Sequence, residues 1–189
     1  MKKILVVAVA MIFATSFSQE KEVEKEFKKR SAGLELTGSR IPSFGVFYER
    51  FWKIGKNYTS QTYELSSVSA NKQGTFNEFT GSGFQISSGT KLYSSDKGGH
   101  KGLFYKNSLV YGNIKFDEKG FLENYKGTYS YFSIFNPEIG YDFMIAKTLR
   151  TSFTAGTQWQ IEVKGKENVD NRDFDNWIFN FGVKLSYDF

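Results

Sequence analysis

Apolar and polar side chains alternate along most of this chain with a period of two residues. The last segment shows this most clearly, because every odd position from Trp177 to Phe189 is apolar while the even positions between them are mostly polar or small. The segments 149–164 and 129–145 repeat the pattern on the same parity. A period of two is typical of β-strands with one apolar and one polar face, so the sequence predicts an all-β fold.

The pattern predicts eight strands separated by turn-like segments. They are expected at 31–38, 43–52, 58–70, 76–93, 103–116, 125–145, 149–164 and 176–189. The third has the weakest pattern because it is rich in Ser and Thr, and Pro137 predicts a bulge in the sixth. The last three exceed the ~5–6 residues of an ordinary strand and reach the about 9–11 residues of a tilted membrane-spanning strand.

The chemistry of the two faces favours a membrane barrel over a soluble sandwich. The polar face carries Gly and charges of both signs, as the filled interior of a narrow barrel requires. Aromatic side chains near the strand ends fit interfacial girdles; they are Trp159, Trp177, Tyr187 and Phe189. The predicted fold is therefore an eight-stranded antiparallel up-and-down transmembrane β-barrel. A soluble lipocalin-like barrel, with an apolar interior and a polar exterior, is the alternative.

The N-terminal segment predicts export from the cytoplasm. A basic start and an apolar stretch from Ile4 to about Ala14 are followed by small residues, with cleavage expected before Gln19. This pattern indicates a secretory signal peptide at 1–18, and the stretch is too short to span a bilayer. The charged segment 19–30 is expected to be a solvated periplasmic lead-in, and the barrel domain to comprise 31–189.

Composition removes several classes of function. The 189 residues include no Cys and one His, which excludes a disulfide framework, Cys-based metal sites and multi-histidine metal sites. Aromatic residues reach 18%, yet the mean hydropathy is −0.43, because alternation averages an apolar face against a charged one. The net charge of +5 falls to +3 without the two lysines of 1–18, and the positive charges are scattered among acidic residues. No nucleic-acid partner is expected.

Charged side chains on the inward-facing parity form the candidate site. They are Glu35, Glu49, Lys106, Glu138, Asp142, Arg150, Glu162 and Lys184. The interior of an eight-stranded barrel is just wide enough for side chains, and an unpaired buried charge is costly, so these residues are expected to pair into a dry network. A proton path or small-ion pore is one alternative. A cavity for apolar molecules is another, because Phe104, Val110 and Ile114 make the inward face of the fifth strand less polar.

Catalytic, cofactor and metal sites are not expected. The single His100 lies in a Gly-rich segment that is predicted to be a periplasmic turn. Glu138 and Asp142 are four residues apart on one strand, about 13 Å at the usual rise, which is too far for an acid–base dyad. The last outer loop carries four acidic residues, Glu167, Asp170, Asp173 and Asp175. Their spacing is not that of an EF-hand, so we expect a solvated loop. A contact with lipopolysaccharide bridged by divalent cations is the alternative.

The terminal run 179–189 ends in Phe189, with apolar side chains at alternate positions before it. With the N-terminal signal and the eight alternating segments, it resembles the small outer-membrane β-barrel proteins of Gram-negative bacteria, the group that contains OmpX and the OmpA transmembrane domain. Two further segments are similar to that family, Tyr48-Glu49-Arg50 and Glu138-Ile-Gly-Tyr141. In the family, residues like Phe181, Val183, Leu185, Tyr187 and Phe189 form the signal that the barrel-assembly machinery reads.

The resemblance implies location more specifically than activity. It implies an outer-membrane protein with both termini in the periplasm, carried there by periplasmic chaperones. Its surface loops would contact lipopolysaccharide or external partners. We expect a monomer of structural or interaction type, without a cofactor. An outer-membrane lipid-modifying enzyme is disfavoured, because its Ser/His/acid chemistry would need a histidine near the outer leaflet, whereas His100 is predicted at the periplasmic side.

Overall fold

A computed structural model describes residues 28–54, 57–73, 78–94, 101–119, 124–167, 169 and 174–189. The predicted signal peptide at 1–18, most of the charged segment 19–30, and His100 lie outside the described residues. The same holds for Asp170 and Asp173. Within the described ranges, a helix of the length and hydropathy needed to span a membrane does not occur.

Ten β-strands form the described structure. They are β1 (Arg30–Gly38), β2 (Ser43–Ile54), β3 (Asn57–Gln73), β4 (Glu78–Tyr93), β5 (Gly102–Lys119), β6 (Asn124–Ser133), β7 (Glu138–Met144), β8 (Leu149–Trp159), β9 (Ile161–Glu167) and β10 (Trp177–Asp188). An interruption at 134–137 separates β6 from β7, and one at Gln160 separates β8 from β9. Each of these pairs continues one predicted strand, so the ten segments correspond to eight strands of the wall.

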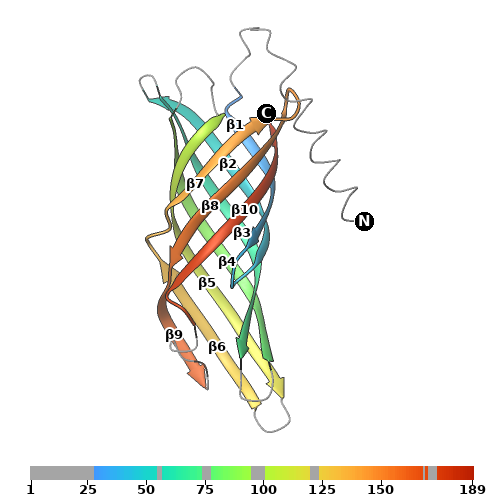
Figure 1. The fold of residues 1–189 in the computed structure, drawn as a ribbon, viewed down its shortest axis with the longest axis vertical. Helices are drawn as coiled ribbons and strands as arrows, with labels where there is room; N and C mark the ends of the chain where they lie inside the picture. Colours follow the sequence, from blue (N-terminus) through green and yellow to red (C-terminus); the bar gives the residue numbers. More distant parts are fainter. Residues whose placement is uncertain are drawn as a thin grey trace.

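The antiparallel sheet closes on itself. Its order is β4-β3-β2-β1-β10-β8-β7-β5-β6-β9, and β4 also pairs with β5. The first and last strands meet along their length, from Ser31 opposite Asp188 to Gly38 opposite Phe181. Figure 1 shows the strands winding at a tilt around one long axis. The predicted eight-stranded antiparallel barrel is confirmed: the described strands pair all the way around the wall, and at one end β9 is paired with β6 and has no described strand on its other side.

Strands continue beyond the wall at one end of the barrel. We call the end where β1 begins and β10 finishes the terminal end, and the opposite end the far end. Figure 1 shows β5, β6 and β9 projecting past the other strands at the far end. There, β6 pairs with β5 on one side and with β9 on the other. β3 spans 17 residues, so the strand with the weakest sequence pattern is among the longest, because β2 and β4 hold it on both sides.

Pro137 lies in a break of the wall at 134–137, where the sequence predicted a bulge. On one side of the break, the N–H groups of Thr157 and Trp159 still donate to the carbonyls of Pro137 and Phe135, both at 3.1 Å. The β6–β9 ladder also shifts register between Ser130 and Tyr131. The sixth predicted strand is therefore irregular rather than absent at this point.

Side-chain amides replace the ladder on the other side of the break. Asn107 Nδ2 donates to the Ile134 carbonyl at 3.3 Å, and its Oδ1 accepts the Asn136 N–H at 2.9 Å. Asn136 Nδ2 in turn donates to the Ser108 carbonyl at 2.6 Å. These bonds satisfy backbone groups that the missing ladder would leave unpaired.

Outside β6, the two faces of the wall differ in the way that the alternation predicted. On β6 the parity is reversed: Tyr129 and Tyr131, expected on the outer face with Tyr141, are completely buried, because the interruption at 134–137 shifts the alternation by one residue. On β10, Phe179 and Phe181 are 71% and 68% exposed, whereas Lys184 on the opposite parity is 2% exposed. Arg150 and Asp142 are completely buried in the interior. Large apolar side chains thus cover the outside and charges fill part of the inside, which is the reverse of the usual distribution in a soluble protein and of the lipocalin-like alternative.

Candidate functional site

The interior contains two groups of charged side chains at different heights. The terminal charge layer lies nearer the terminal end and consists of Glu49, Lys91, Asp142, Arg150 and Asp188. The central charge layer lies further along the barrel and consists of Glu35, Glu64, Lys106, Glu138 and Lys184. Each layer draws its members from several strands, so the closed wall brings together residues that are distant in sequence.

Arg150 on β8 is the centre of the terminal charge layer. Its Nη2 lies 2.7 Å from Glu49 Oε2, its Nη1 2.5 Å from Asp142 Oδ2, and its Nε 3.3 Å from Asp188 Oδ1. Lys91 Nζ lies 3.2 Å from Glu49 Oε1 and 3.0 Å from Asp142 Oδ2. One guanidinium therefore joins carboxylates of β2, β7 and β10, and the lysine joins β4 to the same group.

Aromatic rings and hydroxyls surround this layer. The Phe51 ring lies 4.9 Å from Arg150 Cζ, and the Phe104 ring lies 4.1 Å from Lys91 Nζ. Tyr93 packs with both rings and donates its hydroxyl to Asp142 Oδ2 at 2.7 Å. Because cations interact favourably with ring faces, these contacts stabilise charges that water does not reach.

Glu64 bridges the two lysines of the central charge layer. Its Oε1 lies 2.6 Å from Lys106 Nζ and 2.7 Å from Lys184 Nζ. Lys184 Nζ also lies 3.1 Å from Glu35 Oε2, and Lys106 Nζ lies 3.9 Å from Glu138 Oε1. Among the described residues, each layer contains three carboxylates and two bases, so carboxylates are already in excess and loss of a base increases that excess.

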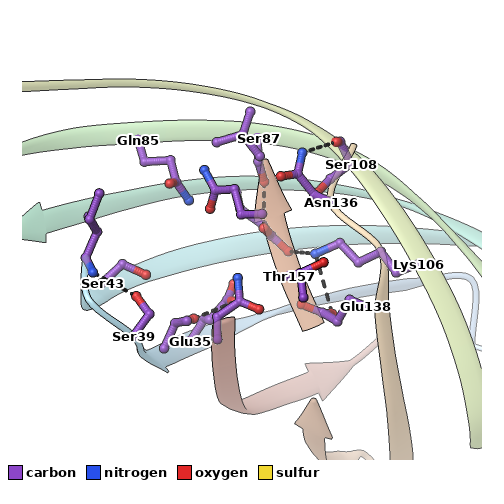
Figure 2. A pocket seen from close by; sticks show the side chains of 16 residues that line it. Glu35, Ser39, Ser43, Gln85, Ser87, Lys106, Ser108, Asn136, Glu138 and Thr157 are labelled. Atoms are coloured by element: carbon purple, nitrogen blue, oxygen red, sulfur yellow. Dashed lines mark hydrogen bonds and ion pairs between the residues drawn. The ribbon is translucent and has the colours of Figure 1, made fainter. Parts of the chain in front are cut away.

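A small polar cavity of about 50 Å³ adjoins the central charge layer. Figure 2 shows side chains of several strands converging on it, with Lys106 and Glu138 on one side and Glu35 and Ser39 on another. Hydroxyl and amide groups supply most of the remaining lining, with Ile41 and Val110 as apolar contributors. A cavity of this size holds a few water molecules at most.

The interior becomes apolar toward the far end. The far-end aromatic cluster comprises Phe79, Phe116, Tyr125, Tyr129, Tyr131 and Phe174, packed with aliphatic side chains that include Ile41 and Ile178. The rings of Tyr129 and Phe174 stack with centroids 4.3 Å apart, and Phe116 meets Tyr125 edge-on at 5.2 Å. The expected polar lumen is thus limited to the two charge layers and the cavity, and aromatic rings fill the barrel beyond them.

The eight charged residues that were predicted to face inward do not all share the same surroundings in the structure. Seven of them belong to the two charge layers, whereas Glu162 lies half-buried on β9, opposite Tyr131 in register and outside both layers. Sequence reasoning missed Glu64, Lys91 and Asp188. Each lies between two outward-facing neighbours, such as Tyr63 and Leu65 around Glu64. Applying the alternation strictly along each strand would therefore have identified all three as inward-facing.

The remaining predicted residues divide between the wall surface and the packed interior. The residues of the proposed assembly signal all lie on the outer face and are 44–68% exposed; they are Phe181, Val183, Leu185, Tyr187 and Phe189. Phe104 belongs to the aromatic group beside the terminal charge layer, while Val110 and Ile114 pack with the far-end aromatic cluster. Phe104 is therefore separated from the other two, and the three do not share one apolar cavity.

No protein-family model matches the sequence, and no curated protein matches it. Among solved structures, the chain is similar to the N-terminal β-barrel domain of Pseudomonas aeruginosa OprF, with a TM-score of 0.43 and 7% sequence identity. The match covers 86% of this chain and 100% of that one. The assignment of the barrel fold here rests on the strand pairing described above.

Proposed function

We propose that this protein is an outer-membrane β-barrel of structural or interaction type, with lipid around its wall. One observation carries the proposal: the outer face is apolar while the charged side chains are buried inside. On monomeric soluble proteins the largest exposed apolar patch is about 300–600 Å². An apolar face on strand after strand needs a non-aqueous environment.

The apolar outer face runs around the barrel rather than covering one side. Exposed large apolar residues occur on β1 to β5, on β7, on β8 and on β10. Examples are Leu34, Phe44, Leu65, Ile86, Leu109, Ile139, Phe153 and Phe181. A single docked partner would cover one sector of the wall, so the distribution supports lipid as the surrounding medium.

Aromatic side chains mark both ends of this apolar surface. Trp159 and Trp177 stack with centroids 6.3 Å apart, and Phe135 meets Trp177 edge-on at 6.0 Å. Tyr187 and Phe189 stack at 6.4 Å at the terminal end. Rings at both levels fit the interfacial girdles of membrane barrels, because amphipathic rings favour the headgroup region.

The arrangement of the two ends supports an orientation with both termini in the periplasm and the far end outside the cell. Membrane barrels have short periplasmic turns and longer outer loops, and the projecting strands lie at the far end. In this orientation the projecting part would contact lipopolysaccharide or external partners. The outward row of β10 would be read by the barrel-assembly machinery after delivery by periplasmic chaperones, and the closed barrel would act as a monomer.

A filled interior supports a structural or interaction role over a channel or an enzyme. The two charge layers and the far-end aromatic cluster follow one another along the axis, and the cavity beside the central layer is only about 50 Å³. The carboxylates of the terminal layer are fully buried and ion-paired, so they are not open to a substrate.

Fractionation and heat-modifiability test the proposal. The full chain, produced in a Gram-negative host, is expected in the outer-membrane fraction, and it should migrate faster in detergent electrophoresis before boiling than after. The folded barrel resists the detergent because its backbone hydrogen bonds form a closed ring. Recovery of a freely soluble, folded periplasmic protein would contradict the proposal.

A further inference from the structure

Among the described residues, the exposed charged side chains at the terminal end of the barrel all have one sign. Six exposed basic residues lie there: Lys29, Arg30, Arg50, Lys53, Lys101 and Lys147. The described carboxylates at this end, Glu49, Asp142 and Asp188, point inward and are completely buried with Arg150. We call the six exposed residues the basic rim.

The far end does not share this bias. Its described exposed charges include Arg40, Lys115 and Lys126, together with Glu78, Asp117, Glu167 and Asp175. Arg40 and Asp175 form an ion pair there. The excess of exposed positive charge is therefore specific to the terminal end and does not extend over the whole surface.

Two arginines of the rim face each other across neighbouring strands. Arg30 on β1 is the register partner of Arg50 on β2, and both lie on the outer face. Like charges directly opposite each other in a sheet are destabilising unless an anion lies between them. The Phe189 N–H donates to the Arg30 carbonyl at 2.9 Å, so a carboxylate at Phe189 would lie beside the arginine pair. It would offset one of the positive charges, and the rest of the basic rim would keep its excess of positive charge.

The pair also lies at the height expected of a membrane surface. Arg50 lies between Tyr48 and Trp52 on the outer parity of β2, and both rings are partly exposed. Tyr and Trp concentrate where hydrocarbon meets headgroups, so their neighbours reach the phosphate level. Guanidinium groups bind phosphate through paired N–H donors, which a lone ammonium cannot do.

We propose that the basic rim binds the phosphate groups of anionic phospholipids in the leaflet next to the terminal end, with Arg30 and Arg50 as the principal contacts. This inference rests on the proposed function, because it requires the barrel to lie in a membrane. It adds a lipid preference that membrane insertion alone does not require. Lys29, Lys53, Lys101 and Lys147 extend the attraction around the mouth.

Quenching of Trp52 tests the proposal, since the other two tryptophans can be replaced. The full chain carrying Trp159→Phe and Trp177→Phe is reconstituted in vesicles of equal parts phosphatidylcholine and phosphatidylglycerol. In one sample the phosphatidylglycerol carries brominated chains, and in the other the phosphatidylcholine does. If the rim binds anionic lipid, brominated phosphatidylglycerol should quench Trp52 more strongly than brominated phosphatidylcholine does. The attraction of a single basic residue for an anionic membrane surface corresponds to a local enrichment of phosphatidylglycerol of roughly fivefold.

Variants separate the arginine pair from general basicity. Arg30→Gln with Arg50→Gln should bring the enrichment close to one, whereas Arg30→Lys with Arg50→Lys should keep part of it. The matched control, Lys115→Gln with Lys126→Gln, removes two charges at the far end and should leave the enrichment at Trp52 unchanged. Equal quenching by the two lipids in the unmodified rim would overturn the proposal while leaving membrane insertion intact. Absence of quenching by either lipid would overturn both the inference and the proposed function.

Discussion

Replacing Arg150 by Met is expected to destabilise the barrel severely. The guanidinium is completely buried and lies within 3.3 Å of three carboxylates, so the substitution leaves Glu49, Asp142 and Asp188 with Lys91 as the one remaining base of the terminal charge layer. Removing one partner of a buried ion pair costs about 3–5 kcal/mol, because the other charge stays buried without compensation. Methionine fills a similar length, which limits the contribution of a cavity.

Unfolding in urea, followed by tryptophan fluorescence of the refolded barrel in lipid vesicles, measures this loss. Lys115→Met is the matched control, since it removes a basic side chain from an exposed position at the far end and should change the free energy of unfolding by no more than about 0.5 kcal/mol. Adding Glu49→Gln to Arg150→Met should recover part of the loss by removing one uncompensated charge. A loss below about 1 kcal/mol for Arg150→Met would refute the claim that this ion network stabilises the fold.

Three further predictions concern the break, the far end and the central layer. Asn107→Ala or Asn136→Ala should each lower the free energy of unfolding by about 1–3 kcal/mol in the same assay, because backbone groups at the break lose their partners. Gly112→Val should displace the Tyr131 ring, which occupies the space of the added side chain, and should speed proteolysis of the projecting strands. The unmodified barrel should show no steady conductance in planar bilayers, and a stable open pore would contradict a filled interior. Glu64→Gln weakens the bridge between Lys106 and Lys184, so this variant should show more frequent brief openings in the same measurement.

Alternation was sufficient to predict the wall, because a closed barrel repeats one local rule on every strand. The same rule gave most of the charged interior, since inward parity is a property of each strand alone. Glu64 was missed because the apolar pattern of the hydroxyl-rich third strand is short, although its neighbours Tyr63 and Leu65 indicate the inward position. The pairing of β3 with β2 and β4 determines the length of that strand.

The far end could not be predicted from parity. Odd-position parity placed Tyr129 and Tyr131 on the outer face, but both are completely buried, because the alternation changes parity at the interruption 134–137 and the projecting strands enclose these rings. Glu162 followed the expected parity yet lies on β9, beyond the height of the charge layers. Height along the axis depends on strand tilt and register, which a single strand's pattern does not contain.

The position of the outer face relative to lipid is the central claim, and cysteine labelling measures it directly in a chain that has no cysteine of its own. Phe181→Cys places a fluorescent label at an outward position that is 68% exposed, and Ser186→Cys provides an inward control on the same strand at 3% exposure. In vesicles, the label at 181 should be quenched by nitroxides on lipid chains and protected from aqueous iodide, while the thiol at 186 should resist labelling in the folded barrel. Quenching at 181 by iodide and not by lipid nitroxides would contradict the account.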